Sequence, residues 1–220
     1  MSTAHSTTAD SAIDTSHDHE AEECPHFGQA TGGKIAMWMF IAQDGMSFGG
    51  LLLAYGILRI TSADWPIPAE ILGIHLTAIA TFLLICSSLS MVMAVDGAKQ
   101  QNKAKTVRWL VVTILGGFSF LGIQAYEYTH LVGEGITFTT STWKGQPINN
   151  LFGSTFYAVT GFHGLHVTAG VIYLLCILKG AMAGKYTQGG ISYSHIELVG
   201  LFWHFVDLVW ILVFTLIYLL

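Results

Sequence analysis

The sequence predicts an all-α integral membrane protein, a bundle of five transmembrane helices. Hydrophobic residues make up 52% of the 220 residues and charged residues only 10%, and the mean hydropathy is +0.56. Five apolar runs reach the ~20 residues that a helix needs to cross a ~30 Å hydrocarbon layer. These runs are continuous rather than alternating, which argues against a membrane β-barrel. The expected spans are roughly 35–58, 71–95, 107–128, 152–178 and 196–220.

The basic residues predict the orientation of the bundle, because cytoplasmic loops of membrane proteins are enriched in Lys and Arg. Most of them lie on the N-terminal side of the odd-numbered spans: Lys34, Lys99, Lys103, Lys105, Arg108, Lys179 and Lys185. Only Arg59 and Lys144 lie on the other side. We therefore expect the N-terminus inside the cell and the C-terminus outside.

The first 34 residues are predicted to be an acidic tail, separate from the five-helix domain at 35–220. Polar and acidic residues dominate it, and no base opposes the acids before Lys34. We expect this tail to be disordered or bound to a partner. It lacks a basic start and an apolar core, so no cleaved signal peptide is expected. The spacing of His17, His19, Cys24 and His26 fits no compact zinc pattern.

The last span carries three ionisable residues in the string HIELVGLFWHFVDLVW at 195–210: Glu197, His204 and Asp207. A charged side chain near the centre of a bilayer costs on the order of 3 kcal/mol. Spacings of seven and three residues place all three on one stripe of a helix. The sequence therefore predicts a polar seam that faces protein.

Five polar residues on three spans share one depth: Asp44, His163, His166, His204 and Asp207. Such a set could form a hydrogen-bonded network, a proton relay or a cofactor site, or it could only join helices. Haem needs ligands from facing helices, and a redox metal needs a compact ligand cluster. Because His163 and His166 share one helix, we expect no metal or haem in this chain.

Asp44 is the candidate for proton chemistry. It follows Ile41, Ala42 and Gln43 in an apolar run, and no basic residue lies near it in the sequence. A buried, isolated carboxyl can buffer or relay protons. The alternative is an acid that makes one structural hydrogen bond.

Three long strings carry a family resemblance: GIQAYEY at 122–128, GSTFYAVTGFHGLHVTAG at 153–170 and the string at 195–210. The chain from about Met37 to its end resembles subunit III of the haem-copper respiratory oxidases, the cytochrome c oxidase subunit III family. Asp44 falls where that family has a membrane-buried, carbodiimide-reactive glutamate, and here the acid is one methylene shorter.

The resemblance also assigns other positions. Trp65 lies in the family's Trp-Pro loop, and Thr81 and Ser87 match polar residues of its second helix, so these three are candidates for lipid contact. The Asn that precedes this Thr in the family is Ala80 here. The matching buried polar positions, candidates for a polar network, are Glu127, His163, His166, Glu197, His204 and Asp207.

The resemblance implies a non-catalytic subunit of a terminal oxidase, which reduces oxygen to water and pumps protons in aerobic respiration. Such a subunit stabilises the catalytic subunit, holds phospholipids in a cleft and supports proton uptake. Its implied partners are oxidase subunits I and II, which carry the haem and copper, and a larger respiratory supercomplex, with no nucleic acid. Five helices resemble the short bacterial form, which implies the bacterial cytoplasmic (inner) membrane.

Two other functions compete with this interpretation. One is an accessory membrane protein of the same superfamily that associates with nitric oxide reductase. The other is a proton-coupled transporter using Asp44, Glu127 and Glu197, although the inverted repeats and broken helices of such folds are not visible. Whether the oxidase's electron donor is cytochrome c or quinol is not decided by this sequence.

Overall fold

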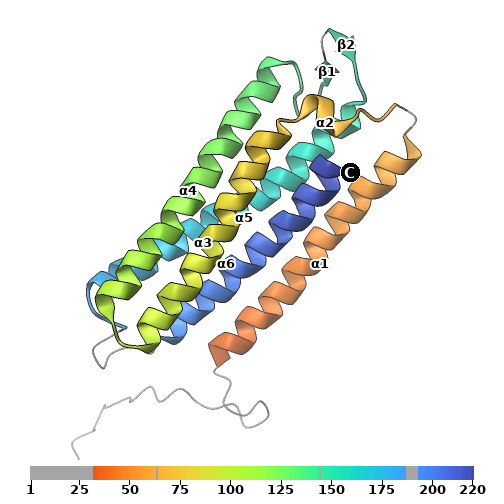
Figure 1. Ribbon diagram of the computed structural model, residues 1–220. Helices are drawn as coiled ribbons and strands as arrows, with labels where there is room; N and C mark the ends of the chain where they lie inside the picture. The colour runs from red at the N-terminus through yellow and green to blue at the C-terminus, as the bar shows by residue number, and fades with distance from the viewer. Residues whose placement is uncertain (1–31, 63, 144, 187–192) are drawn as a thin grey trace, which may run out of the picture.

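The computed structural model describes residues 32–62, 64–143, 145–186 and 193–220, and long helices dominate it (Figure 1). The helices are α1 (Gly32–Thr61), α2 (Pro68–Ile71), α3 (Ile74–Lys99), α4 (Lys103–Gly133), α5 (Asn150–Met182) and α6 (Ser194–Val213), which continues into the π-helical segment η1 (Phe214–Leu219). Five helices of the described part are long and apolar enough to cross a membrane. The predicted fold class is confirmed, whereas residues 1–31 of the expected acidic tail and Lys144 lie outside the described residues.

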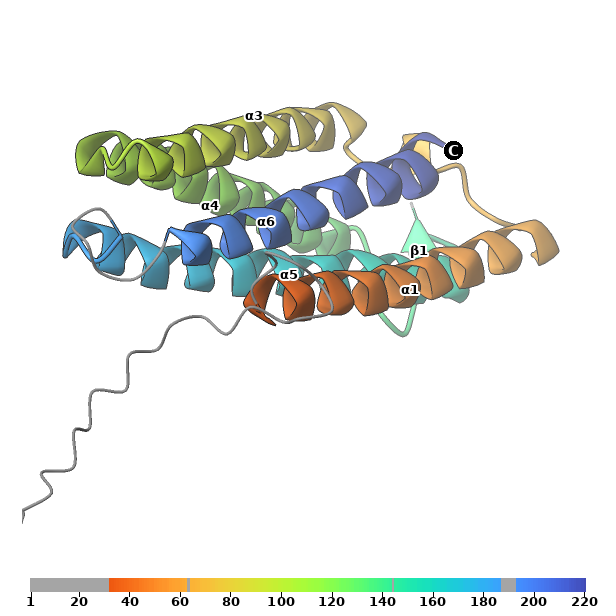
Figure 2. The same cartoon turned by 90° about the horizontal axis from the view of Figure 1, so that it is seen from below.

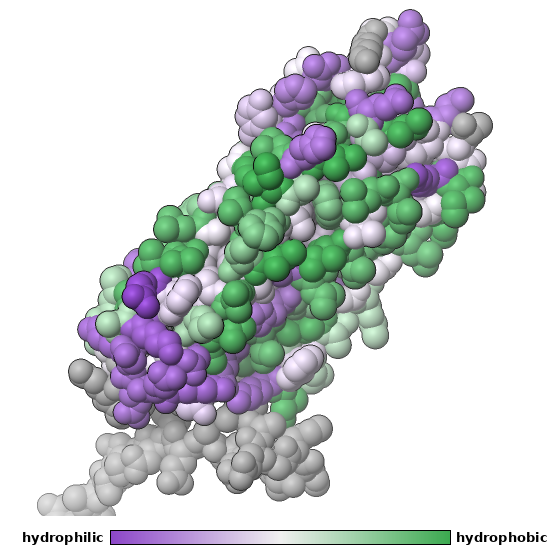
Figure 3. Space-filling view, in the orientation of Figure 1, coloured by the Kyte–Doolittle hydropathy of each residue, from purple (hydrophilic) through white to green (hydrophobic). Residues whose placement is uncertain are grey.

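Helices α1, α4 and α5 extend beyond the predicted spans at both ends. Helix α4 has 31 residues and α5 has 33. At ~1.5 Å per residue these helices are about 46–50 Å long, well beyond a ~30 Å hydrocarbon layer. Their polar ends therefore project past the apolar layer, and Figure 3 shows hydrophilic residues at both ends of the visible face with hydrophobic residues between them.

Helix α6 lies at the centre of the arrangement. It packs against α3, α5 and α1, while α3 and α4 form the most extensive helix pair (Figures 1 and 2). Helix α1 packs mainly on α6 and α5, and its other side is open. The charged residues Lys34 and Arg59 hold its two ends: Lys34 pairs with Glu197 of α6, and Arg59 donates to the carbonyl of Leu220. The last helix thus anchors α1 along its length.

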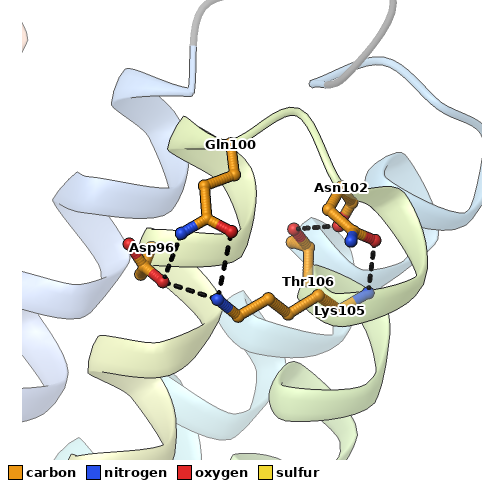
Figure 4. Close-up of polar contacts among 5 residues, drawn as sticks. All are labelled: Asp96, Gln100, Asn102, Lys105 and Thr106. Atoms are coloured by element: carbon orange, nitrogen blue, oxygen red, sulfur yellow. Dashed lines mark hydrogen bonds and ion pairs between the residues drawn. The ribbon is translucent and has the colours of Figure 1, made fainter.

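The connection between α3 and α4 is fixed by side chains (Figure 4). Asn102 caps α4 by accepting a 3.0 Å hydrogen bond from the backbone N–H of Lys105. The ammonium of Lys105 reaches back to Asp96 of α3 at 2.6 Å. Gln101 takes the left-handed conformation (φ 52°) that lets so short a turn reverse the chain.

The opposite end of the bundle holds small elements that the sequence did not predict. These are α2 and a hairpin of β1 (Thr142–Trp143) and β2 (Gln146–Pro147), which are antiparallel with Thr142 opposite Pro147. Gly145 in the hairpin turn has φ 77°, which a glycine adopts without strain. Two-residue strands give too short an alternation to be detected in a sequence.

The bundle closes around Trp203 of α6. A Cβ atom added to Gly117 of α4 would lie 2.8 Å from this indole, and one added to Gly170 of α5 would lie 3.0 Å from it. The indole N–H donates a 3.1 Å hydrogen bond to the Ser87 hydroxyl of α3. One fully buried side chain therefore joins four helices, and it fits because two of them present glycine.

We expect Gly117→Ala to lower the free energy of unfolding by about 1–3 kcal/mol, because the added methyl overpacks against Trp203 and Val171. The measurement is thermal unfolding in detergent, followed by circular dichroism. Gly122→Ala is the matched control, since this glycine of the same helix has no atom within 4 Å of an added Cβ. Equal melting temperatures for the two variants would contradict the packing role.

Candidate functional site

Asp44 and His166 form a buried pair between α1 and α5. Asp44 is 8% exposed, and its Oδ2 lies 3.2 Å from His166 Nε2. His166 Nδ1 lies 2.8 Å from the Phe162 carbonyl oxygen, so this nitrogen carries a proton and donates. The sequence showed no partner for Asp44 because His166 is distant in the chain.

The geometry of this pair allows two arrangements with one proton. Since Nδ1 donates to a carbonyl, Nε2 faces the carboxylate either bare or protonated. At 3.2 Å the two groups can hold one proton between them, either on Asp44 beside a neutral imidazole or on His166 beside a carboxylate, although Oδ2 makes no well-aligned hydrogen bond with a described residue. Both forms have no net charge, which is the arrangement that an apolar environment tolerates best.

His163 lies one turn before His166 and is fully buried. Its ring packs against Trp210 at 4.8 Å and Phe120 at 5.7 Å between centroids. Within the described part of the chain, neither ring nitrogen has a hydrogen-bond partner. Buried polar atoms of this kind are commonly satisfied by ordered water.

Two residues of the expected polar seam on the last helix, Glu197 and His204, contact α3. Glu197 Oε1 lies 3.1 Å from Lys99 of α3, and its Oε2 lies 2.7 Å from Lys34 of α1. His204 contacts Ser88 of α3 through Nδ1. Among the described residues, no hydrogen bond or ion pair joins Glu197, His204 or Asp207 to the Asp44–His166 pair.

A cavity of about 470 Å³ opens between α1, α3 and α6 at the end of the bundle that carries these lysines. Its walls combine apolar and charged side chains. They are Lys34, Trp38, Val92, Val95, Asp96, Lys99, Glu197, Gly200, Leu201 and His204. The cavity therefore extends from an ion-paired mouth to the imidazole of His204.

Asp207 lies one turn beyond His204 and is 5% exposed. Neither carboxylate oxygen has a hydrogen-bond partner among the residues that the structure describes. The Ser88 hydroxyl lies near both His204 and Asp207, and its hydrogen bond is with Nδ1 of the imidazole. A carboxylate left in this way needs a proton, a water or a rotated hydroxyl.

Glu127 of α4 has a different environment, with partners for both oxygens. Thr77 of α3 donates to Oε1 at 3.0 Å, and Tyr218 of η1 donates to Oε2 at 2.8 Å. This buried acid joins three elements near the end of the bundle opposite the lysines. Glu127 therefore joins these helices as a structural contact, because each of its carboxylate oxygens already accepts a hydrogen bond.

The three lipid-contact candidates lie in two environments. Thr81 accepts a 2.9 Å hydrogen bond from the Trp210 indole, and Ser87 accepts one from Trp203. Both hydroxyls are buried within the bundle and join helices. Trp65 is half-buried beside Tyr55 and Phe152, and its indole N–H has no partner in the described ranges.

Sequence reasoning missed several partners. Ser88 and Tyr218 are the most important, and neither residue type signals a site by itself. In the sequence, Lys34 and Lys99 indicate only the orientation of the bundle, and in the structure both pair with Glu197. The described residues contain no group of three or more His, Cys, Asp or Glu that could hold a metal ion.

Comparisons with known proteins agree on one family. A family model described as cytochrome c oxidase subunit III matches residues 24–220. A Pseudomonas aeruginosa protein named cytochrome bo(3) ubiquinol oxidase subunit 3 is 32% identical over 95% of this chain and 93% of its own length. The Bacillus subtilis cytochrome c oxidase subunit 3 is 34% identical over 84% and 85%. A Mycobacterium leprae protein named as a probable cytochrome c oxidase subunit 3 is 36% identical over 82% and 84%.

We expect Tyr218→Phe to lower the free energy of unfolding by about 1–3 kcal/mol, because it leaves a buried oxygen of Glu127 without its donor. Tyr126→Phe is the control, since Tyr126 is 61% exposed on the outer face of α4. Chemical denaturation in detergent micelles measures the difference. A similar loss for the two variants would argue against this structural contact.

Proposed function

We propose that this chain, which belongs to the cytochrome c oxidase subunit III family, sustains proton uptake and holds lipid in its oxidase. It is a multi-pass membrane protein and a non-catalytic subunit III of a haem-copper oxidase. Aerobic respiration, with oxygen reduced to water and protons pumped, is then the activity that it supports. The observation that carries the proton role is the buried Asp44–His166 pair.

We place the chain in the bacterial cytoplasmic membrane beside subunits I and II, which would carry the haem and copper, and within a larger respiratory supercomplex. The lysines that pair with Glu197 and Asp96 lie at one end of the bundle. The preference of Lys and Arg for the cytoplasmic side supports an orientation with this end inside the cell. The N-terminus is then inside and the C-terminus outside.

The pair suits proton uptake because it can hold one proton without a net charge. A carboxyl and an imidazole at 3.2 Å exchange that proton between them without moving a helix. Phe48 and Phe162 pack against the His166 ring at 5.2 and 4.7 Å, which limits water access to it. Such a group can buffer the supply of protons to a neighbouring catalytic subunit.

Outward-facing apolar side chains support contacts with lipid and partner subunits. They are numerous on three helices and include Met39, Met46 and Leu53 of α1, Phe82, Ile85 and Leu89 of α3, and Leu115 and Phe118 of α4. Trp65 contacts Tyr55, which lines a cavity of about 310 Å³ with Arg59 and Leu216. A phospholipid would find an apolar wall and polar donors there.

The competing function, an accessory protein of nitric oxide reductase, has less support. The three relatives described above are all named as oxidase subunits. Purification in mild detergent distinguishes the two functions. A co-purifying haem-copper oxidase supports our proposal, and a co-purifying nitric oxide reductase contradicts it.

Removing this subunit should leave the haem and copper content of the oxidase unchanged while turnover decays faster during catalysis. The reason is that the redox metals would belong to partner subunits and this chain sustains their proton supply. Optical spectra and the time course of oxygen consumption measure the two quantities. Equal endurance of the depleted and complete enzymes would rule out the supporting role.

Asp44→Asn should slow proton uptake by about ten-fold at alkaline pH, with little effect at neutral pH. The isosteric amide keeps the shape of the side chain but cannot hold the proton shared with His166. A stored proton matters most at alkaline pH, because the concentration of protons in solution is lowest there. The measurement is the pH profile of turnover in the assembled oxidase. Gln43→Ala is the control, because Gln43 is the exposed neighbour. An unaltered pH profile for Asp44→Asn would contradict the proposal.

A further inference from the structure

A second group of polar residues can exchange protons, and it is separate from the Asp44–His166 pair. It consists of Ser88 on α3 and His204 and Asp207 on α6. The Ser88 hydroxyl contacts His204 Nδ1 and faces the Asp207 carboxylate. Asp207 is buried, and its two oxygens have no hydrogen bond within the described part of the chain.

This group has a route to the surface. His204 lines the cavity of about 470 Å³ whose other walls include Lys34, Lys99 and Glu197. Charged side chains at the mouth and an imidazole at the inner end favour water in such a cavity. Since Nδ1 of His204 is engaged by Ser88, Nε2 is the nitrogen left for a water molecule there.

We propose that His204, Ser88 and Asp207 form a proton-accepting site that is reached through this cavity from the basic end of the bundle. His204 receives the proton, Ser88 passes it on, and Asp207 keeps it. The two oxygens of Asp207 that lack a partner are the observation that separates this site from a purely structural contact. The inference does not depend on the proton role of Asp44.

The transfer balances atom by atom. A proton from cavity water binds His204 Nε2 while the Nδ1–H proton moves to the Ser88 oxygen. The original Ser88 hydroxyl proton moves to a carboxylate oxygen of Asp207. His204 is left as the Nε2–H tautomer, and the site resets when Ser88 rotates and the imidazole exchanges its proton with water.

Among the described residues, no hydrogen bond or ion pair links Asp207 to another ionisable group. On the adjacent elements, α5 contributes His163, whose ring packs against Trp210 one turn beyond Asp207. The charged groups at the cavity mouth are Lys34, Lys99, Glu197 and Asp96, and each has an ion-pair partner. Ser88 is therefore the one polar neighbour of Asp207 given by the described contacts that also reaches the cavity-lining imidazole.

The experiment is infrared spectroscopy of the complete oxidase complex in lipid nanodiscs, with exchange from H₂O into D₂O. The signal is the carbonyl stretch of a protonated carboxyl. We expect Asp207→Asn to remove one such band and Asp44→Asn to leave that band in place. Ser88→Ala should slow deuterium exchange of the band by about ten-fold or more, and Ser88→Thr should restore it.

Two further variants distinguish a blocked proton path from a defect in folding. Ser90→Ala is the control, because Ser90 contacts Thr113 of α4 and loses an equivalent hydroxyl from the same helix. Leu201→Trp fills the cavity from its wall without changing the three site residues, and it should also slow exchange. This variant keeps the test decisive if Asp207→Asn prevents assembly.

Three results would overturn the proposal. The first is a carboxyl spectrum that Asp207→Asn leaves unchanged. The second is exchange at the wild-type rate in both Ser88→Ala and Leu201→Trp. The third is a band that does not exchange in the wild-type complex, as expected if lipid acyl chains fill the cavity and keep it dry.

Discussion

The fit of Trp203 between two glycines is the contact on which the bundle depends. In a bilayer the hydrophobic effect contributes little to the association of helices. Close packing and hydrogen bonds between helices must therefore stabilise the bundle. Gly117 and Gly170 let α4 and α5 approach the indole, and Ser87 of α3 accepts its N–H. With four helices fixed around one side chain, α6 becomes the central element, and α1 needs only to attach to it and to α5.

That central position explains where the polar residues are found. Polar groups of α6 and η1 face other helices instead of lipid: Glu197, His204 and Trp203 reach α3, while Tyr218 reaches α4. Each contact satisfies a group that hydrocarbon would leave without a partner. Asp207 is the exception on this helix, since the described contacts leave its oxygens without a hydrogen bond.

Much of this could be predicted from sequence, for reasons that are physical. Five apolar runs are long enough to specify five spans, and the spacing of Glu197, His204 and Asp207 specifies one face of a helix. Pairing between distant helices could not be predicted in the same way. The partner of Asp44 is His166, 122 residues later in the chain, and nothing in either local sequence selects the other. The hydroxyls of Ser87 and Ser88 are adjacent in sequence, yet one serves packing and the other a buried acid, because consecutive helical residues point in different directions.

Asp44 and Asp207, two of the three buried carboxylates among the described residues, differ in how they can exchange protons. Asp44 lies beside His166, whose ring is covered by two aromatic rings, and both one-proton forms of this pair are neutral. Asp207 has no such partner. The Ser88 hydroxyl lies next to it, and the His204 imidazole, which contacts Ser88, lines a cavity with charged side chains at its mouth. In a medium of low dielectric constant a proton moves only along hydrogen-bonding groups. The rate of proton exchange at Asp207 therefore depends on Ser88 and on water in the cavity. Proton exchange at Asp44 depends on proton donors and acceptors that reach the pair from outside this chain. A supporting subunit with this arrangement can hold one proton at Asp44, which is covered from water, and one at Asp207, which exchanges through the cavity. Neither carboxylate then needs to destabilise the bundle.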